Sequence, residues 1–411
     1  MEQSPKAEAH GSPLVSVVVL AYNHLECTRE CIESVFRYTQ GIDYELIAVD
    51  NGSSDGTGEY LDSLGNVKKV AFPENIGVCT ALNRGFAAAR GEFIMYLSND
   101  TVVTHRWLDN LLACLEDPKV GMVVPVCDAS CNYQQVVLPH GTMEELQEAA
   151  ERYNVSNPAF WEERLKLLTY AALYRTEILR KIGGLDEDFN PGSYDDDAVS
   201  FSIRRMGYKI LLAKDTFIHH VGNLTFRKEY EKDGGLMRRN MNLFIRKFGA
   251  DPYVAGLIDD NVLNLLSFGG AEDVNILGIG RSYGTTVLQL KNLCKRFGSK
   301  KIGLYYLCEQ PLTMTDLKTI CDECLVGRAS DAASLFGGRR YDYIVVESDS
   351  RSLGKPEEFF PSVYGLLKPG GRLVCTAADP AALYSVMGVL YGLGAGFDGH
   401  SKYYYLCFHK N

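Results

Sequence analysis

The sequence predicts an α/β protein with two domains, each built on a mostly parallel sheet. Apolar runs such as LVSVVVLAYN, FIMYLSND and VNILGIG are typical of strands that are covered on both faces. Segments with helical spacing of apolar residues follow after short connections, and such strand–helix repeats predict parallel sheets. At roughly 150 residues per domain, 411 residues suggest two or three domains.

Composition shifts along the chain predict its organisation. We expect a flexible tail at 1–12, a first domain at 13–250, a helical connector at 251–271 and a smaller domain at 272–411. Within the first domain, the polar segment 142–168 is predicted to be helical and interrupts the strand–helix order. Insertions of this kind usually shape access to a site, so we expect this region to control which substrate enters.

Charge and cysteine usage narrow the function classes. With 52 Asp plus Glu against 42 Lys plus Arg, a general nucleic-acid binder is not expected. The 12 cysteines are scattered through apolar segments, which is typical of a reducing compartment. Cys321 and Cys324 form a lone Cys-x-x-Cys pair, for which two buried thiols are favoured over a zinc site.

The N-terminus and the longest apolar stretch bear on location. The first residues, MEQSPKAEAHGSP, lack the basic-then-apolar order of a signal peptide. The stretch 380–397 approaches the length of a membrane span, but its glycines among aromatic residues favour a buried helix, turn and strand. We therefore expect a cytoplasmic protein without a membrane span, with attachment to the inner face of the membrane left open.

Polar residues stand where three predicted strands end. They are Ala21-Tyr22-Asn23, Asp50-Asn51-Gly52 and Ser98-Asn99-Asp100. Carboxyl ends of parallel strands meet at one edge of a sheet, where ligands of such folds bind. A buried, unpaired carboxylate is costly, so Asp100 is solvated, binds a ligand or caps the helix around HRWLDNLLACL.

Residues 14 to about 250 resemble the family 2 glycosyltransferases of the GT-A fold. The motifs that carry the resemblance follow in order as VSVVVLAYNHLECTRECIESV, ELIAVDNGSSDGT, NIGVCTALNRGFAAARGEFIMYLSNDT, GGLDEDF and YDDDAVSFSIRRMGYKI. The resemblance implies a GT-A nucleotide-sugar-binding domain that transfers a sugar, with inversion, from a nucleotide-diphosphate sugar. The acceptor is left open among a glycan, a lipid-linked saccharide and a protein.

The resemblance also implies roles for residues that hold the donor and a metal ion. Asp50, helped by Asp55, would contact the base, and Ser98-Asn99-Asp100 stands where the family has Asp-x-Asp. Because Ser98 replaces the first acid, Asp100 is the one charged ligand there, and Mn²⁺ or Mg²⁺ would rely on substrate phosphates. His220, preferred over His219, is a further metal ligand with packing as the alternative. The other expected donor-binding residues are Ala21, Tyr22, Asn23, Asn83, Arg84 and Asn99.

An acidic cluster precedes the apolar helix AVSFSIRRMGYKI. Like charges at Asp195–Asp197 favour a raised carboxyl pKa, which suits a general base. The family has a Glu-Asp pair here, which maps to Asp195 and Asp196, with Asp196 as the base. Relatives often place another acid where this chain has Ala198, so the base could be off by one. A plain N-cap run is the other interpretation.

Residues 272–411 resemble the Rossmann-like methyltransferases that use S-adenosylmethionine, through VNILGIGRSYG, YDYIVVES and LLKPGGRLV. The resemblance implies that Gly278 and Gly280 let the backbone approach a cofactor and that Glu309 accepts a ribose hydroxyl. Ser282 stands where a third glycine is usual, so S-adenosylmethionine is left open as a cofactor. Two alternatives follow, namely a bifunctional glycosyltransferase and methyltransferase, or a nucleotide-sugar-binding scaffold without turnover, which Ser98 would suit.

Overall fold

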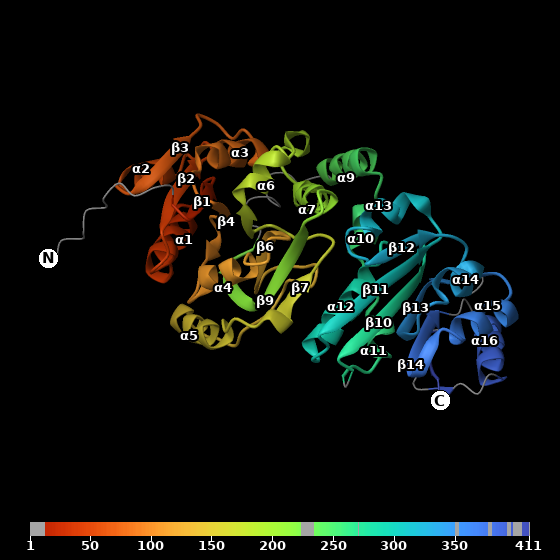
Figure 1. Cartoon of the computed structure of the whole chain (residues 1–411). Coiled ribbons are helices and arrows are strands. Elements are labelled where there is room, and N and C mark those ends of the chain that lie inside the picture. Colours follow the sequence, from red (N-terminus) through yellow and green to blue (C-terminus); the bar gives the residue numbers. More distant parts are fainter. Residues whose placement is uncertain are drawn as a thin grey trace. The chain divides into compact units, whose positions relative to one another are not determined.

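The chain folds into two compact units, drawn in Figure 1. The first comprises Met1–Trp161 and Lys166–Phe248, and the second comprises Glu162–Leu165 and Gly249–Asn411. This computed structural model describes residues 13–222, 234–269, 271–349, 353–376, 380–392, 396–397 and 405–410.

The sheet of the first unit has the strand order β3-β2-β1-β4-β8-β6-β9-β5. β1, β2, β3 and β4 run parallel, as do β6 and β9, but β8 lies antiparallel between β4 and β6. The sheet is therefore mixed, and the prediction of a mostly parallel sheet misses β8. The strands are β1 (Val15–Ala21), β2 (Tyr44–Asp50), β3 (Val67–Ala71), β4 (Phe93–Ser98), β5 (Thr101–Val102), β6 (Val120–Cys127), β7 (Trp161–Glu163), β8 (Ala171–Arg175) and β9 (Lys209–His220).

Helices cover this sheet, and α3 packs closely on β1 and β2 (Figure 1). At Gly85 of α3 an added Cβ would lie 2.6 Å from Val49 and 2.8 Å from Val18, so this glycine serves packing on the sheet. The helices are α1 (Leu25–Tyr38), α2 (Thr57–Asp62), α3 (Val78–Ala88), α4 (Trp107–Cys114), α5 (Met143–Tyr153), α6 (Thr176–Lys181), α7 (Asp195–Arg205) and α9 (Gly235–Phe248), with 3₁₀ turns η1 (Pro158–Phe160) and η2 (Glu187–Phe189).

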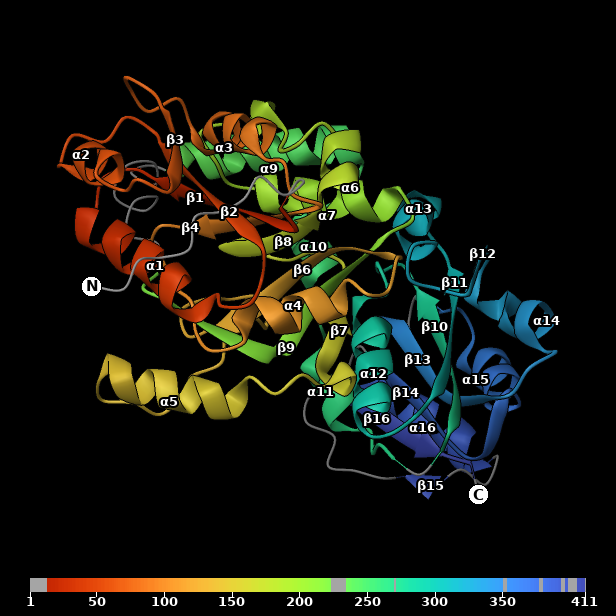
Figure 2. The ribbon, with the colours of Figure 1, turned by 60° about the vertical axis from the view of Figure 1, so that its left-hand side comes forward.

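The segment 142–168 is helical only in its first part, which corrects the sequence prediction. α5 begins with a capping box between Thr142 and Glu145 and ends at Tyr153 beside β9 (Figure 2). It stops there because the Asn154 side chain is buried and accepts a hydrogen bond from Phe217 N at 2.7 Å. Pro158 then begins a 3₁₀ turn, and the chain continues in extended form.

The second unit contains a seven-stranded sheet with the order β12-β11-β10-β13-β14-β16-β15. Its first five strands in that order are parallel, and β16 runs antiparallel to β14 and β15. The strands are β10 (Asp273–Gly280), β11 (Lys301–Cys308), β12 (Glu323–Val326), β13 (Tyr341–Asp349), β14 (Leu367–Thr376), β15 (Gly396–Phe397) and β16 (Tyr405–His409).

Helices pack on this second sheet, with α12 against β10 and β11, and α15 against β14. The segment expected as a connector forms the two short helices α10 and α11, which cluster with this unit. The helices are α10 (Pro252–Gly256), α11 (Asp260–Asn264), α12 (Thr285–Arg296), α13 (Met314–Leu317), α14 (Ala332–Phe336), α15 (Pro356–Tyr364) and α16 (Pro380–Gly392), with 3₁₀ turns η3 (Pro311–Thr313) and η4 (Ala329–Asp331).

The described part of the chain holds no helix long and apolar enough to cross a membrane. In the apolar stretch 380–397, α16 and β15 are described, and 393–395 lie outside the described residues.

Replacing Gly85 by alanine should destabilise the protein. The added methyl group overpacks α3 against Val18 and Val49, which costs about 1–3 kcal/mol, whereas removing a glycine from a helix gains at most about 1 kcal/mol. Urea unfolding measures the change in the free energy of unfolding. Gly65→Ala is the control, because a Cβ there meets nothing within 4 Å. A midpoint for Gly85→Ala equal to that of the wild type would contradict this packing.

Candidate active site

The register confirms that the three polar strand ends meet at one edge of the first sheet. Ala21 pairs with Asp50, and Leu20 pairs with Ser98. The Asp50 carboxylate is buried at the end of β2 and accepts a hydrogen bond from Ser53 N at 2.9 Å. An acid therefore stands at the β2 side of this edge.

The loops after β1 and β2 are locked together by hydrogen bonds. Asn23, in the left-handed region with φ 55°, accepts a bond from Ser54 N at 2.9 Å. Asp55 accepts from Leu25 N at 2.9 Å and from the Thr57 hydroxyl at 2.6 Å. Partial burial works against the charged form of Asp55, but these hydrogen bonds outweigh it and lower its pKa. Asn23 and Asp55 thus shape the loops after β1 and β2 at this edge of the sheet.

Asn99 and Asp100, at the end of β4, face different partners. The Asn99 amide donates to Asn23 O at 3.1 Å and to Thr28 Oγ1 at 2.9 Å, so it fixes the neighbouring loop. Asp100 is buried, and its Oδ1 lies 3.4 Å from His220 Nε2. α4 begins at Trp107 with Arg106 at its N-cap, so Asp100 does not cap that helix.

His220 reaches Asp100 because β5 pairs with the end of β9, where Thr101 lies opposite His220. Its Nδ1 lies 2.8 Å from Ala129 O, which can only accept, so Nδ1 carries a proton and Nε2 faces Asp100. Asp128 accepts bonds from His220 N at 2.9 Å and from His219 Nδ1 at 2.6 Å. Of the two histidines, His220 is therefore the one that faces Asp100, whereas His219 faces Asp128.

Each member of the Asp100–His220 pair favours the charged form of the other. Burial alone would raise the pKa of Asp100, but the adjacent His220 outweighs it and lowers this pKa. Burial likewise disfavours a charged imidazole, yet Asp100 and Cys127 raise the pKa of His220 to about 10. Asp100 and His220 therefore form a partly buried ion pair.

The Asp100–His220 pair fits two ligands of a divalent cation. Among the described residues, Asp100 Oδ1 has no partner in hydrogen-bond geometry although it is buried. An imidazole whose other nitrogen donates to a carbonyl is a common metal ligand. The described residues contain no cluster of three or more His, Cys, Asp or Glu able to hold a metal ion.

The acids at the start of α7 lie within the helix rather than at its N-cap, which is Tyr194. Asp196 Oδ1 accepts hydrogen bonds from Thr169 N, at 3.1 Å, and from the Thr169 hydroxyl. Asp197 forms an ion pair with Lys166 at 2.8 Å. The carboxylates are thus engaged by the segment before β8, and the interpretation as a plain N-cap run does not describe them.

Burial raises the pKa of each carboxyl group in this cluster. For Asp195 burial raises the pKa to about 6. For Asp196 burial comes first and the charge of Asp195 second, and together they raise the pKa to about 8. A carboxylate that exchanges its proton near neutral pH can serve as a general base.

Thr169 and Tyr170 connect the two chemical groups. Thr169 holds Asp196, while Tyr170 O accepts a bond from Ser98 N at 2.9 Å. The Tyr170 ring also stacks on His220, with ring centroids 5.1 Å apart. One dipeptide therefore contacts both Asp196 and His220 of the Asp100–His220 pair.

Sequence reasoning missed Thr169, Tyr170 and Asp128. Asp128 follows β6 in the same way that Asp100 follows β4, so an acid at the end of an apolar run was a usable signal. Thr169 and Tyr170 carry no such signal, because their partners Asp196 and His220 are distant in sequence.

Asn83 and Arg84 lie on α3, and their side chains face the segment around η2. The Asn83 amide donates to Leu185 O at 2.8 Å and accepts from Leu185 N at 2.8 Å. Arg84 lies 3.7 Å from Glu187 and is half exposed. The Asn83 amide is thus occupied by the protein itself.

In the second unit the face of Gly278 is filled by a side chain. A Cβ on Gly278 would lie 2.4 Å from the Tyr306 ring, whose hydroxyl donates to Glu347 at 2.7 Å. Glu309 N donates to Gly280 O at 2.9 Å, so this acid does follow β11 beside the glycine turn. The glycine of β10 therefore makes room for Tyr306.

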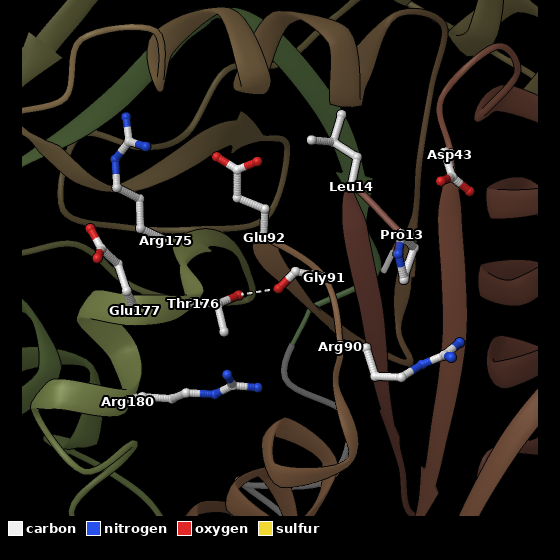
Figure 3. Close-up of a pocket in the computed structure, with 10 residues that line it drawn as sticks. All are labelled: Pro13, Leu14, Asp43, Arg90, Gly91, Glu92, Arg175, Thr176, Glu177 and Arg180. Carbon is white, nitrogen blue, oxygen red and sulfur yellow. Dashed lines mark hydrogen bonds between the residues drawn. The ribbon is translucent and has the colours of Figure 1, made fainter. Parts of the chain in front are cut away.

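A cavity of about 770 Å³ lies at the opposite, amino-terminal edge of the first sheet (Figure 3). Three arginines line it, but Arg90 pairs with Glu45, Arg175 donates to Val120 O and Arg180 donates to Ala89 O. Because the arginines are engaged by the protein, we place the candidate site at the carboxyl-terminal edge instead.

Comparison with known proteins identifies a family for part of the chain. Residues 16–183 match the family described as Glycosyl transferase family 2. The chain contains a glycosyl transferase family 2 domain. The matched part includes Asp50 and Asp100, whereas Asp196 and His220 lie beyond it.

Two relatives of the family 2 domain cover different shares of the chain. An uncharacterized protein, y4gI of Sinorhizobium fredii, is 30% identical over 217 residues, which is 48% of this chain and 23% of the relative. Glycosyltransferase GlyG of Streptococcus pneumoniae is 34% identical over 118 residues, 28% of this chain and 38% of the relative. The chain thus spans well under half the length of either relative.

A solved structure is also similar in part. It is mannosyltransferase PcManGT from Pyrobaculum calidifontis in complex with GDP-Man and Mn2+, with 21% identity and a TM-score of 0.42. The match covers 57% of this chain and 65% of that chain.

Asp196→Asn should make the protein more stable at alkaline pH. The pKa of Asp196 is raised in the fold, so the folded state binds its proton more tightly and stability falls as pH rises from about 4 through about 8. The amide carries no charge, so its gain over the wild type should reach up to about 5 kcal/mol at pH 9 and vanish near pH 4.

Urea unfolding from pH 4 to 9 measures this difference. Asp62→Asn is the matched control, since Asp62 lies on the surface and pairs with Lys69. Stability profiles that run parallel for wild type and Asp196→Asn would show that Asp196 is not perturbed.

Proposed function

We propose that the chain is an inverting, metal-assisted glycosyltransferase that uses a nucleotide-diphosphate sugar. The family 2 domain and relatives named as glycosyltransferases support a transferase. The observation that carries the proposal is the dipeptide Thr169–Tyr170, which places the Asp100–His220 pair and the raised-pKa acid Asp196 at the same edge of the sheet. A glycan, a lipid-linked saccharide or a protein would provide the acceptor hydroxyl.

The donor would lie across the ends of β1, β2 and β4. Asp50, buried at the end of β2, would accept hydrogen bonds from the base, with Tyr22 and Asn23 at the same edge of the sheet. Asp100 and His220 would hold Mn²⁺ or Mg²⁺, which would neutralise the diphosphate as it leaves.

Asp196 would act as the general base. Its pKa of about 8 lies close to neutral pH, where a base is both available and strong enough to accept a proton. It takes the proton of the acceptor hydroxyl while that oxygen attacks the anomeric carbon and the bond to the diphosphate breaks. One such displacement inverts the configuration of the anomeric carbon.

The charges of both acids act on Tyr96. Burial raises the pKa of Tyr96 most, and the carboxylates of Asp196 and Asp100 add to it. Tyr96 lies on β4, two residues before Ser98, so both acids act on the same buried side chain.

The alternatives find less support in the described residues. For methyl transfer in the second unit, the space beside Gly278 is filled by the ring of Tyr306. A scaffold without turnover is suggested by Ser98, which stands in place of the first acid. Asp100 is still present, however, and it pairs with His220. We therefore favour the transferase.

The donor and the metal requirement can be tested together. The purified protein is incubated with UDP-, dTDP-, GDP- and CMP-sugars, with Mn²⁺, Mg²⁺ or EDTA, and candidate acceptors, and released nucleotide is measured. We expect one donor to be consumed and EDTA to stop its consumption. Retention of the anomeric configuration in the product, read by NMR, would refute the inverting mechanism.

Substitutions at the two acids should separate their roles. Asp196→Asn should lower kcat about 10²- to 10⁴-fold, because proton removal is lost, and keep donor binding. Asp100→Asn should weaken the dependence on Mn²⁺, because one charged ligand is lost. Asp117→Asn, at a surface ion pair with Lys209, is the control and should retain activity. Full activity in Asp196→Asn would exclude this base.

A further inference from the structure

Residues Lys166–Thr169, here called the strap, are fixed to the first turns of α7. Lys166 pairs with Asp197 at 2.8 Å, and Leu167 N donates to Ser200 Oγ at 3.2 Å. Thr169 donates to Asp196 through both its N–H and its hydroxyl. The strap therefore contacts α7 between Asp196 and Ser200.

The strap is also held from its other side. The amide of Gln134 brackets Leu168, accepting from its N–H at 2.7 Å and donating to its carbonyl at 3.0 Å. Asn132 donates to Lys166 O at 3.2 Å. Gln134 is fully buried. Because Gln134 and Asn132 also hold the strap, its position does not depend on α7 alone.

We infer that Thr169 is a positioning residue for the base Asp196. This inference rests on the proposed function. Both donors of Thr169 converge on Oδ1 of Asp196, which leaves Oδ2 to receive the proton of the acceptor. A carboxylate held at one oxygen by two donors loses its freedom to rotate, so its second oxygen keeps one direction.

Other charged and titratable groups face Asp196 as well. Asp195 and Asp197 lie on its own helix, and Lys166 of the strap neutralises Asp197. Tyr96 of β4, Tyr174 of β8 and Cys79 of α3 are close enough for its charge to raise their pKa values further, after burial. Thr169 differs from these in donating hydrogen bonds to the charged form.

The test compares Thr169→Val with Thr169→Ser. Valine keeps the branched shape and the N–H but lacks the hydroxyl, so kcat should fall about 10-fold with little change in the donor KM. The lost donor had stabilised the carboxylate, so the acidic limb of the kcat–pH profile should move to higher pH. Serine keeps the hydroxyl, so Thr169→Ser should restore both the wild-type kcat and the wild-type position of the acidic limb.

Thr176→Val is the matched control. Thr176 is also a buried threonine of the first unit, and its hydroxyl donates to Gly91 O at 2.8 Å at the far edge of the sheet (Figure 3). This variant should lose stability like Thr169→Val but leave the pH profile unchanged. Equal pH profiles for wild type, Thr169→Val and Thr176→Val would overturn the inference.

A readout that needs no turnover separates this inference from the proposed function. Carboxyl carbons are labelled in aspartate, and the Asp196 signal is assigned by its loss in Asp196→Asn. The titration of that signal should move to higher pH in Thr169→Val and return in Thr169→Ser. An unmoved titration together with normal transfer would refute the role of Thr169 and leave the transferase standing. A moved titration in a protein inactive on every donor and acceptor would refute the proposed function instead.

Discussion

The insertion of β8 between β4 and β6 is the constraint on which the candidate site depends. The strand runs against both neighbours, so its first residue lies at the edge where β4 ends. The chain must enter β8 across that edge, and Thr169 and Tyr170 are the residues that do so. Their hydrogen bonds and the stacked ring of Tyr170 then join α7 to the ends of β4 and β9.

The acids gathered there oppose folding. Asp195 and Asp197 are buried at the start of one helix, and the raised pKa values of Asp195 and Asp196 express the cost of charging them. The dipole of α7, the cation of Lys166 and the donors of Thr169 offset part of this cost. Such perturbed carboxyl groups are concentrated at functional sites, where chemistry rather than stability sets the composition.

Local patterns predicted the parts of the fold that local chemistry controls. The apolar runs of β1, β2 and β4 and their polar ends could be read directly, and so could their meeting at one edge. The direction of β8 could not, because AALYR is equally suited to either direction. The helix expected over 142–168 stops at Tyr153, since Asn154 forms buried bonds to residues far along the chain. The contact between Thr169 and Asp196 could not be predicted either, because these residues are also far apart in the sequence.

The position of β9 sets a limit on how the first unit can be divided. The part that matches the family ends at 183, after β8 but before α7 and β9. β6 is buried along its whole length, with β8 on one side and β9 on the other. A fragment cut at 183 would therefore expose the backbone of an apolar strand as an open edge, which invites pairing between molecules and aggregation. Expression of this unit alone calls for a boundary beyond β9.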